Sequence, residues 1–518
     1  MLKGRTGPWA VAAGVGLLAA LVGVAGAASS LVKVSEGTSP FAPRCDGVPA
    51  DGTNYANSEV EVRVAVDPRN PAHAVGVWQQ DRWSTGGAHG LVAATTDDGV
   101  HWSRSFAHFS RCAGGTAGNG GDYPRASDPW VDFAPNGHVY QTSLSVNLPD
   151  ATTAVLVSRS VDGGVTWGEP VTLRRDRGDA FNDKESVTAD PTDPMGRRVY
   201  VVWDRLEGMG LPVAAAGRVP LVPTKGPAWF ARTTDGGATW EPGRPIYDPG
   251  LGRQTIGNQI VVLPDGTLLD GFAFGGSTAE REAGAGGDGG ESSGSGGDVL
   301  GDLPAEPEAE SVVGLSVGVI RSTDHGATWS APAVIGAIRP AENSARLRAG
   351  QILPSFAVDP RSGTLAAVWL DGRFDASRHA GVALSTSTDG GRTWTEPRRV
   401  NQTPAGVAAF LPSVAFAADG IVGVSYYDLR NRPVGAPAVT TDAWLATCTV
   451  ACGQDGVWRE THLGGPFDAA KAPNSRGSFL GDYQGLAGVL PGRFRAFFVE
   501  ADPGTADDPT DVFSSEAG

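Results

Sequence analysis

The sequence predicts an all-β chain folded as a β-propeller, which is a ring of four-stranded antiparallel sheets called blades. Three observations lead to this prediction. A Trp-ended phrase, STDGGRTW at 387–394, recurs along the chain, paired apolar runs surround tight turns, and no long stretch has helical period. The 518 residues exceed the usual size of a single core, and 73 glycines and 37 prolines suit many short strands.

The Trp-ended phrase sets the repeat. Its five good copies are TTDDGVHW at 95–102, SVDGGVTW at 160–167, TTDGGATW at 233–240, STDHGATW at 322–329 and STDGGRTW at 387–394, and a degenerate sixth copy, GQDGVW, lies at 453–458. The closing tryptophans are about 65 residues apart, except for a longer interval before Trp329, and such a period indicates repeats. The additional residues of this longer interval lie at 275–310 and are rich in Gly, Ser and Glu, so we expect a disordered, low-complexity insertion there.

Apolar runs on both sides of a turn predict two-stranded hairpins. In VRVAVDPRNPAHAVGVW, at 62–78, the turn DPRN separates two strands. The seven predicted hairpins span 62–78, 130–144, 186–203, 259–272, 355–369, 413–427 and 485–499. A third apolar run follows, such as GLVAAT at 90–95, and the Trp-ended phrase then leads into a fourth strand. Each repeat is therefore expected to form one antiparallel blade of four strands.

The two ends of the sequence are expected to close the ring. The seventh hairpin is followed by DVFSSEAG at 511–518, which supplies a third strand and no fourth. The run LVKVSEG at 31–37 could pair with it and leave no open blade edge. We therefore expect seven blades over 58–518, with six as the alternative, and an N-terminal segment at 28–57 that contributes the closing strand.

The phrase itself has the composition of a structural turn. Its Asp can accept hydrogen bonds from backbone N–H groups of the turn, its Gly tolerates a left-handed conformation, and its Trp packs between blades. Catalysis or metal binding by these aspartates is disfavoured, because equivalent positions around an outer rim cannot converge on one ligand. The predicted structural aspartates are Asp97, Asp162, Asp235, Asp324 and Asp389.

The N-terminus has the pattern of a secretory signal peptide over residues 1–27. Lys3 and Arg5 precede an apolar run at 9–24, and Ala25-Gly26-Ala27 resembles a cleavage site. An uncleaved membrane anchor is the alternative. In both cases we expect the body of the protein to be secreted or displayed at the cell surface.

Four cysteines agree with an exported protein. Cys448 and Cys452 are close enough in sequence to bridge a local loop, which leaves Cys45 and Cys112 as a second pair. Zinc is the alternative, but no CxxC motif or histidine cluster accompanies these cysteines.

The charge and the remaining motifs exclude several classes of function. The net charge is −16 and no run of Lys or Arg occurs, which argues against nucleic acid and anionic membranes as partners. The eight histidines lack metal-ligand spacing, and the glycine-rich segments lack phosphate-loop spacing. We therefore expect no metal, no cofactor and a monomer.

The phrase S/T-x-D-x-G-x-T-W resembles the Asp-box, or BNR repeat, of the sialidase superfamily, and its copies extend over nearly all of the chain after the signal segment. The resemblance implies a propeller whose centre binds an acidic sugar. Sialidases hold the substrate carboxylate with three arginines, attack with a Tyr that a Glu activates, and protonate the leaving oxygen with an Asp. Asp-boxes also occur in propellers that only bind or scaffold, so the resemblance does not establish activity.

Candidate site residues follow from the strand ends that should face the propeller centre. Four second strands end in an Asp followed by an Arg, in WQQDRW, VWDRL, VWLDGR and SYYDLR. The candidate anion clamp is Arg82, Arg205, Arg373 and Arg430. The alternative is that each arginine forms a structural salt bridge with a nearby aspartate.

First-strand starts supply the candidate catalytic residues. Tyr483, in GDYQG, is similar in position to the sialidase nucleophile, and Glu185, in DKES, to its base. Asp81 or Asp128 is the candidate proton donor. The alternatives are a packed Tyr483 and a Glu185 in a solvated turn.

The sequence also departs from the family pattern. The loop WSTGGAHG at 83–90, where sialidases carry the acid, contains no carboxylate, and Arg63 lacks the proline of the family's F/Y-R-I-P strand. These departures put the proton donor in doubt.

Together these features predict an exported sialidase-like glycoside hydrolase, of exo-α-sialidase type, that acts on acidic-sugar glycosides at the central mouth of a propeller. The alternative is a non-catalytic propeller at the cell surface that binds a glycan or a protein.

Overall fold

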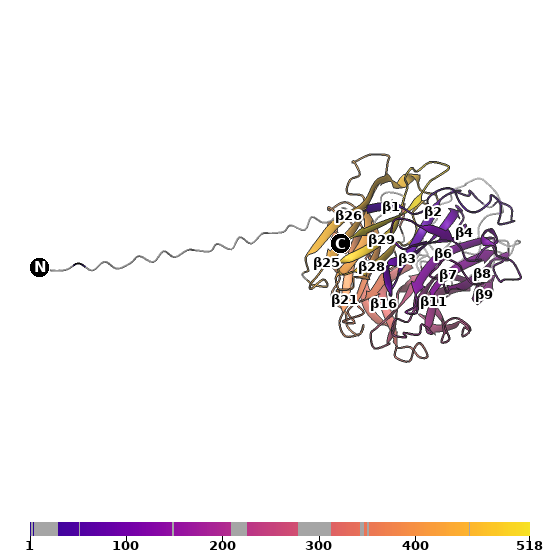
Figure 1. Cartoon of the computed structure of the whole chain (residues 1–518), viewed down its shortest axis with the longest axis horizontal. Coiled ribbons are helices and arrows are strands. Elements are labelled where there is room, and N and C mark those ends of the chain that lie inside the picture. Colours follow the sequence, from indigo (N-terminus) through magenta and orange to yellow (C-terminus); the bar gives the residue numbers. More distant parts are fainter. Residues whose placement is uncertain are drawn as a thin grey trace, which may run out of the picture.

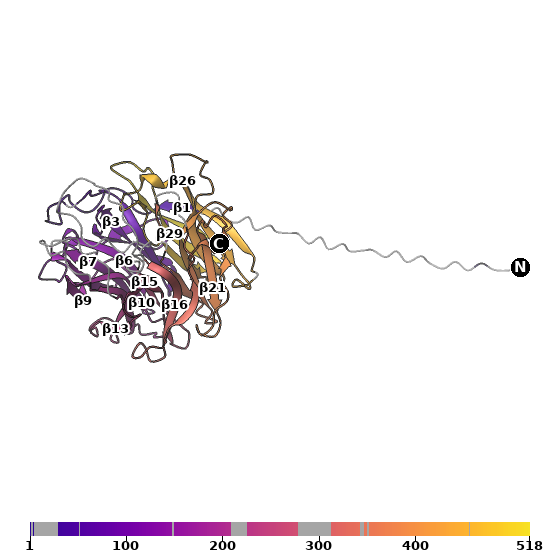
Figure 2. The ribbon, with the colours of Figure 1, turned by 180° about the vertical axis from the view of Figure 1, so that it is seen from behind.

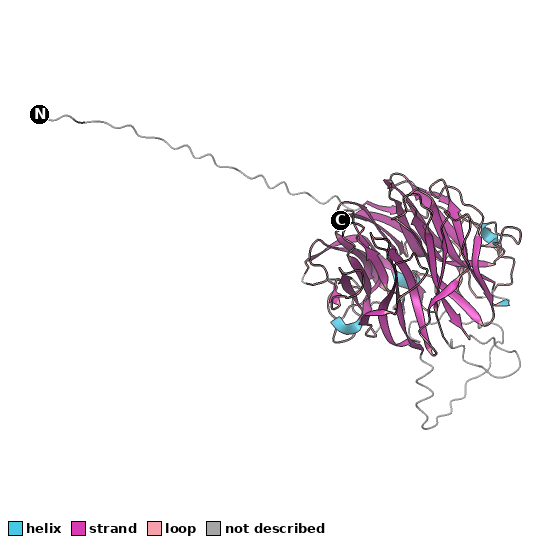
Figure 3. Ribbon diagram, turned by 90° about the horizontal axis from the view of Figure 1, so that it is seen from below, coloured by secondary structure: helices cyan, strands magenta, loops and turns pink. Residues whose placement is uncertain are grey.

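The structure is a computed structural model of the 518-residue chain. It describes residues 1, 4, 30–50, 52–147, 150–208, 225–277, 312–341, 347–349, 352–454 and 456–518. Strands dominate these residues (Figure 3), which confirms the all-β prediction. Within these described residues, helix is limited to short 3-10 turns, among them η1 (Arg111–Ala113), η4 (Gly372–Phe374) and η5 (Ala469–Lys471). In the described part of the chain, no helix has the length and apolar character needed to cross a membrane.

The strands form successive antiparallel sets of four, which we number in chain order. Set 1 is β2 (Glu59–Asp67), β3 (Asn70–Arg82), β4 (Ala88–Thr96) and β5 (Ser103–Ser105). Set 2 is β6 (Arg125–Phe133), β7 (Val139–Asn147), β8 (Thr152–Ser160) and β9 (Val171–Arg177). Set 3 is β10 (Ala180–Ala189), β11 (Val199–Glu207), β12 (Ala228–Thr233) and β13 (Arg244–Tyr247). Sets 1 and 2 are joined into one sheet by the pair Ala88–Ala126.

The next three sets repeat this pattern. Set 4 is β14 (Arg253–Val262), β15 (Leu268–Ser277), β16 (Val312–Ser322) and β17 (Ala333–Ala337). Set 5 is β19 (Ser355–Val358), β20 (Leu365–Asp371), β21 (Gly381–Ser387) and β22 (Arg398–Arg399). Set 6 is β23 (Ala409–Phe416), β24 (Val422–Asp428), β25 (Thr440–Cys448) and β26 (Trp458–Asp468).

Set 7 combines strands from opposite ends of the sequence. It is β28 (Gly485–Leu490), β29 (Arg493–Glu500), β30 (Asp511–Ala517) and β1 (Ser30–Lys33). β1 pairs antiparallel with β30, Leu31 opposite Ser515 and Lys33 opposite Phe513. A separate parallel pair, β18 (Leu347–Arg348) and β27 (Ser478–Phe479), lies outside the sets.

The first strands of consecutive sets lie side by side in an order that returns to its start. β2 contacts β6, β6 contacts β10, and the series continues through β14, β19, β23 and β28, which contacts β2 again. In Figure 1 the colours accordingly pass around the body from purple through magenta and orange to yellow, and Figure 2 shows the same order from behind. The seven first strands therefore surround a common centre.

Bulges interrupt several first strands near this centre. The pairing register of β2, β6, β10, β14 and β23 shifts at a residue with a left-handed backbone. These residues are Glu61 (φ 53°), Asp128 (φ 51°), Lys184 (φ 48°), Gly257 (φ 72°) and Leu411 (φ 51°). A bulge redirects the side chains beside it, and non-glycine residues adopt this conformation at a cost of about 1–3 kcal/mol. Three of these positions, Glu61, Asp128 and Lys184, carry charged side chains.

Apolar side chains fill the spaces between neighbouring sets. One core cluster joins Trp130 and Tyr140 of set 2 to Trp203 and Trp229 of set 3. Trp240, which closes the third copy of the phrase, packs against this cluster. The tryptophans of the other phrases likewise pack against core clusters. Burial of such side chains, worth roughly 1.5–3 kcal/mol each, holds adjacent sheets together.

The Trp-ended turns share a hydrogen-bond pattern. In four copies an Asp carboxylate accepts the backbone N–H of the Thr four residues later, at 2.9 Å, and the aspartates are Asp162, Asp235, Asp324 and Asp389. The first copy differs from the prediction. Asp98 accepts the N–H groups of Val100 and His101, both at 2.8 Å, whereas Asp97 pairs with His73. Counted from the end of the preceding strand to the closing tryptophan, this turn is one residue shorter than the others, from Thr96 to Trp102 instead of from Ser160 to Trp167. The second of the two adjacent aspartates, Asp98, therefore accepts the backbone hydrogen bonds.

Both predicted disulfides are present, Cys45–Cys112 and Cys448–Cys452. The predicted signal segment at 1–27 lies outside the described residues, apart from Met1 and Gly4. Of the predicted insertion at 275–310, residues 275–277 belong to the end of β15, and the rest lies outside the described residues.

Candidate functional site at the centre of the seven sets

Lys184 lies where side chains from three sets meet. Its Nζ is 2.8 Å from Oδ1 of Asp128, 2.8 Å from Oδ2 of Asp482 and 3.3 Å from Oε1 of Glu61. All four side chains are at most 7% exposed. Three of the four occupy the bulges described above, so the bulges bring these charges together. We call this group the hub cluster.

Burial of these charges is costly unless they compensate one another. Burial raises the pKa of Glu61 to about 8, although the charge of Lys184 opposes this shift. Gln79 donates through Nε2 to Glu61 and to Ser127, the latter at 2.9 Å. Glu61 is therefore held largely as a neutral acid near pH 7, and Asp128 and Asp482 are the closest partners of Lys184.

Two arginines flank the hub cluster from the direction of β27. Nη2 of Arg348 is 2.7 Å from Oδ2 of Asp482, and Nη1 of Arg82 donates to Gln79 at 2.7 Å. Both guanidinium groups stack on the ring of Phe479, at 4.2 Å and 4.6 Å from its centroid. Arg82 is fully buried, whereas the Arg348 side chain is 15% exposed. Of these two arginines, Arg348 is therefore the one more exposed to solvent.

Glu185, the next residue in the sequence after Lys184, has a buried carboxyl whose oxygens accept no hydrogen bond. The residue is 1% exposed, and neither Oε1 nor Oε2 has a hydrogen-bond partner. Burial, reinforced by the negative charge of Asp128, raises the pKa of Glu185 well above its usual value. A shift in this direction favours the acid form of the carboxyl, which can donate a proton.

Tyr483 packs beside these carboxyls. Its ring lies 5.5 Å from that of Trp130, and its hydroxyl donates to the carbonyl of Pro129 at 3.2 Å. Burial and the charges of Glu61 and Asp128 raise the pKa of the phenol. Because Glu185 accepts no hydrogen bond from it, the expected nucleophile–base pair is not hydrogen-bonded in this structure.

A cavity opens at the hub cluster. It is narrow: the volume that the centre of a water molecule can occupy is about 20 Å³. Its lining includes Lys184, Glu185, Asp482 and Tyr483, with Arg63 over the ring of Trp130 at 3.7 Å. The lining combines a carboxyl with a raised pKa, a carboxylate, cations and aromatic faces, the kinds of groups used to bind and cleave sugars.

The four arginines of the expected clamp do not come together. Arg205, Arg373 and Arg430 each form salt bridges with nearby carboxylates, as the alternative interpretation predicted. Arg205 is bound by both oxygens of Asp176 at 2.9 Å, Arg373 by both oxygens of Asp371 at 2.8 Å, and Arg430 by Asp428 at 2.6 Å and Glu460 at 2.7 Å. A bidentate pair is the favoured geometry for an isolated Arg and carboxylate, so these groups neutralise each other locally. Only Arg82 reaches the hub cluster.

The structure also separates the two candidate proton donors. Asp128 belongs to the hub cluster. Asp81 instead accepts hydrogen bonds from Asn57 N at 2.7 Å, Ser39 Oγ at 2.7 Å and His89 Nδ1 at 3.0 Å. These contacts tie the N-terminal segment to β3, so Asp81 has a structural role here.

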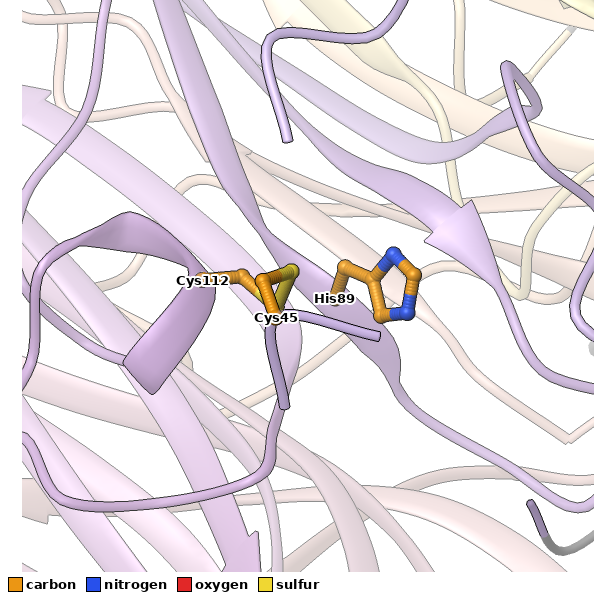
Figure 4. Close-up of side chains that lie close together, drawn as sticks. All are labelled: Cys45, His89 and Cys112. Carbon is orange, nitrogen blue, oxygen red and sulfur yellow. A yellow bond between two sulfur atoms is a disulfide. The ribbon is translucent and has the colours of Figure 1, made fainter. Parts of the chain in front are cut away.

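His89 also lies beside a disulfide. Figure 4 shows its ring next to the bonded sulfur atoms of Cys45 and Cys112. The three side chains are close enough to share a metal ion. Both sulfur atoms are in the disulfide, however, and thiolates are what zinc requires, so this group does not fit a zinc site.

Sequence reasoning missed Glu61 and Arg348 as members of the hub. Glu61 alternates with apolar residues in EVEVRVAV, as a strand residue exposed to solvent would. Arg348 comes from a segment between sets with no strand pattern. A signal did exist for Lys184 and Asp482, because both stand just before the first strands predicted at 186 and 485.

No protein-family model and no curated protein matches the chain. Three solved structures illustrate its structural similarities. A protein of unknown function from Dyadobacter fermentans is 14% identical, with a TM-score of 0.44 over 76% of this chain and 94% of that one. A Hadza microbial sialidase is 17% identical, with a TM-score of 0.43 over 86% and 73%. An ulvan lyase of a polysaccharide lyase family is 13% identical, with a TM-score of 0.45 over 80% and 81%.

Proposed function

We propose that the seven sets are the blades of one seven-bladed propeller of the sialidase-like, Asp-box kind. The order of first-strand contacts, which returns from β28 to β2, supports this proposal. So does the Asp–Thr bond that recurs at 2.9 Å in four turns whose aspartates are exposed or half-buried. The signal pattern at 1–27 and the two disulfides support export to an oxidising compartment.

The function that this site supports best is hydrolysis of acidic-sugar glycosides at the hub cluster, of exo-α-sialidase type. The observation that carries it is Glu185, a buried carboxyl without a hydrogen-bond partner, on the lining of a cavity that also holds cations. Glycoside cleavage needs a proton donor that remains protonated at working pH and a second group that acts at the anomeric carbon.

The proposed roles differ in part from those that the family resemblance implies. Glu185 donates its proton to the leaving glycosidic oxygen, because its raised pKa favours the acid form. Tyr483, on the same cavity, is the proposed nucleophile: its oxygen bonds to the anomeric carbon as the bond to the leaving oxygen breaks, and its hydroxyl proton passes to the carboxylate of Asp128, whose charge acts on the phenol. Arg348 binds the carboxylate of the acidic sugar, since it is the most exposed cation of the hub.

The proposal is tested with the purified protein on fluorogenic glycosides, an α-sialoside and other acidic and neutral sugars. We expect release of the fluorophore from an acidic glycoside and a loss of at least about 100-fold in kcat/KM in Tyr483→Phe, whereas Glu185→Gln should lose less than about 10-fold on these aryl glycosides, whose leaving groups need little protonation. Glu241→Gln, which alters an exposed carboxylate, is the matched control and should retain activity. Absence of turnover on every substrate contradicts the proposed hydrolysis.

A second candidate is a non-catalytic propeller that binds an acidic glycan at the same centre. Two observations favour it: three of the four clamp arginines are neutralised by nearby carboxylates, and Tyr483 donates to the Pro129 carbonyl rather than to Glu185. Binding on a glycan array without turnover, lost in Arg348→Ala, would favour this function over hydrolysis.

A further inference from the structure

Three carboxylates gather where set 7 passes the start of set 1, away from the cavity. Glu59 begins β2, Asp511 begins β30, and Asp508 lies in the loop before β30. One oxygen from each lies within 4.8 Å of the others. Glu59 and Asp511 are buried, each 1% exposed, whereas the Asp508 side chain is 25% exposed. The group is therefore partly enclosed, with one side reachable from solvent.

In each carboxylate, one oxygen accepts a hydrogen bond from a neutral polar side chain. A neighbouring polar side chain donates a hydrogen bond to that oxygen and so fixes the orientation of the carboxylate. The three bonds are Gln80 Nε2 to Glu59 Oε1 at 2.6 Å, Asn57 Nδ2 to Asp508 Oδ1 at 3.0 Å, and Ser35 Oγ to Asp511 Oδ1 at 2.8 Å. Outer partners of this kind orient the ligands of metal sites.

The second oxygens are left to a single cation. Nζ of Lys33 is 2.6 Å from Oδ2 of Asp511 and 3.6 Å from Oδ2 of Asp508. Oε2 of Glu59 is buried and has no hydrogen-bond partner. Three formal negative charges thus face one positive charge, which leaves a formal charge of −2. Lys33 is 34% exposed, so its long side chain can move toward water when another cation enters.

We propose that Glu59, Asp508 and Asp511 form a binding site for one divalent hard cation, and that this cation is calcium. Carboxylate oxygens are the ligands that calcium prefers, and Ca–O distances of about 2.3–2.6 Å reach oxygens spread over 4.8 Å. Magnesium binds at about 2.0–2.1 Å and requires a tighter octahedral arrangement. A bound cation would link β2 to the loop and strand that close set 7, and so would stabilise the junction between the first and last sets.

Calorimetric titration of the purified protein, first treated with chelator, tests the proposal with CaCl₂ and MgCl₂ in separate arms. We expect one calcium per chain with a Kd on the order of 10⁻⁵–10⁻³ M, and binding of magnesium at least ten-fold weaker. Calcium should also raise the thermal unfolding midpoint. No binding heat and no shift of the midpoint up to 10 mM calcium, taken as about ten times the weakest Kd expected, would overturn the proposal.

Variants separate this site from other acidic groups of the surface. Glu59→Gln and Asp508→Asn should each weaken calcium binding at least ten-fold, and the exposed Asp508 provides a variant that folds if the buried change does not. Lys33→Met should bind calcium more tightly, because the competing cation is removed. Glu241→Gln is the control and should bind as the wild type does. Equal calcium responses in Asp508→Asn and the wild type would contradict the assignment, and an equal response to magnesium would contradict the choice of calcium.

Discussion

Replacing Glu500 by glutamine is expected to make the stability of the protein less sensitive to alkaline pH. Glu500 ends β29 and is 3% exposed. Burial, with the charge of Asp502, raises its pKa from 4.5 to about 8. A carboxyl with a raised folded-state pKa favours the folded state while it is protonated. That contribution is complete below about pH 4.5 and is lost as the pH rises through about 8.

The size of the effect follows from the pKa shift. A difference of about 3.5 pKa units corresponds to about 5 kcal/mol at 1.36 kcal/mol per unit. Entry of water around the ionised carboxylate reduces this value, so we expect about 3–5 kcal/mol. Glutamine has nearly the same shape and does not ionise, so the variant should keep the stability that the wild type loses between pH 5 and pH 9.

The assay is urea unfolding at pH 5 and pH 9, with disulfides intact and with chelator present so that bound cations do not contribute. The free energy of unfolding should fall between these pH values by about 2–4 kcal/mol more in the wild type than in Glu500→Gln, because part of the effect is already lost at pH 5. Glu241→Gln, at a side chain that is 46% exposed, should follow the wild type. Parallel losses in wild type and Glu500→Gln would refute the reasoning.

Three further predictions concern the turns, the paired arginines and the disulfides. Asp235→Ala removes bonds from Thr239 N at 2.9 Å and Oγ1 at 2.6 Å, and should lower the free energy of unfolding by about 1–2 kcal/mol in urea titrations without altering glycan binding. Arg205→Ala removes one of the two arginines that bind both oxygens of Asp176, the other being Arg174, and should lower stability by about 1–3 kcal/mol with KM unchanged; a ten-fold rise in KM at unchanged stability would contradict the structural role. Removal of the disulfide that closes 67 residues should cost about 4 kcal/mol, and removal of the one that closes 4 residues about 2 kcal/mol, as measured by thermal unfolding; the reverse order would contradict the chain-entropy argument.

The strand order was readable from the sequence because local signals agree with the tertiary structure. The predicted hairpin at 62–78 corresponds to β2 and β3, and the one at 485–499 to β28 and β29. In each case a turn with Pro, Gly or Asn separates two apolar runs, and each run buries against a neighbouring set. Hydrophobic pattern and turn chemistry act over a few residues, so a single sequence is enough to reveal them.

The candidate site was harder to predict because its geometry depends on bulges and on partners distant in sequence. Nothing in the letters around Glu61 or Lys184 indicates a left-handed backbone, which the pairing of a whole sheet imposes. The motif Asp-x-Arg was equally ambiguous. In DGR, Asp371 binds Arg373 through both oxygens, whereas the same residue types could have pointed to a shared centre. Orientation of a long side chain is decided by the nearest compensating charge, and the sequence does not show which charge that is.

The same limit applies to the first Trp-ended turn. Adjacent aspartates in TTDDGVHW are equivalent by composition, and the alignment with the other copies favours Asp97. The shorter turn brings Asp98 to the backbone N–H groups instead. A change of one residue in loop length was enough to transfer the structural role.

The central claim is that the hub holds Glu185 protonated so that it can assist departure of a sugar leaving group. Comparison of an alkyl glycoside, whose poor leaving group needs a proton, with a nitrophenyl glycoside, whose leaving group departs without one, tests it most directly. We predict that Glu185→Gln lowers kcat/KM at least about 100-fold on the alkyl glycoside and less than about 10-fold on the nitrophenyl glycoside. Equal losses on the two substrates, or no loss on either, would contradict the account.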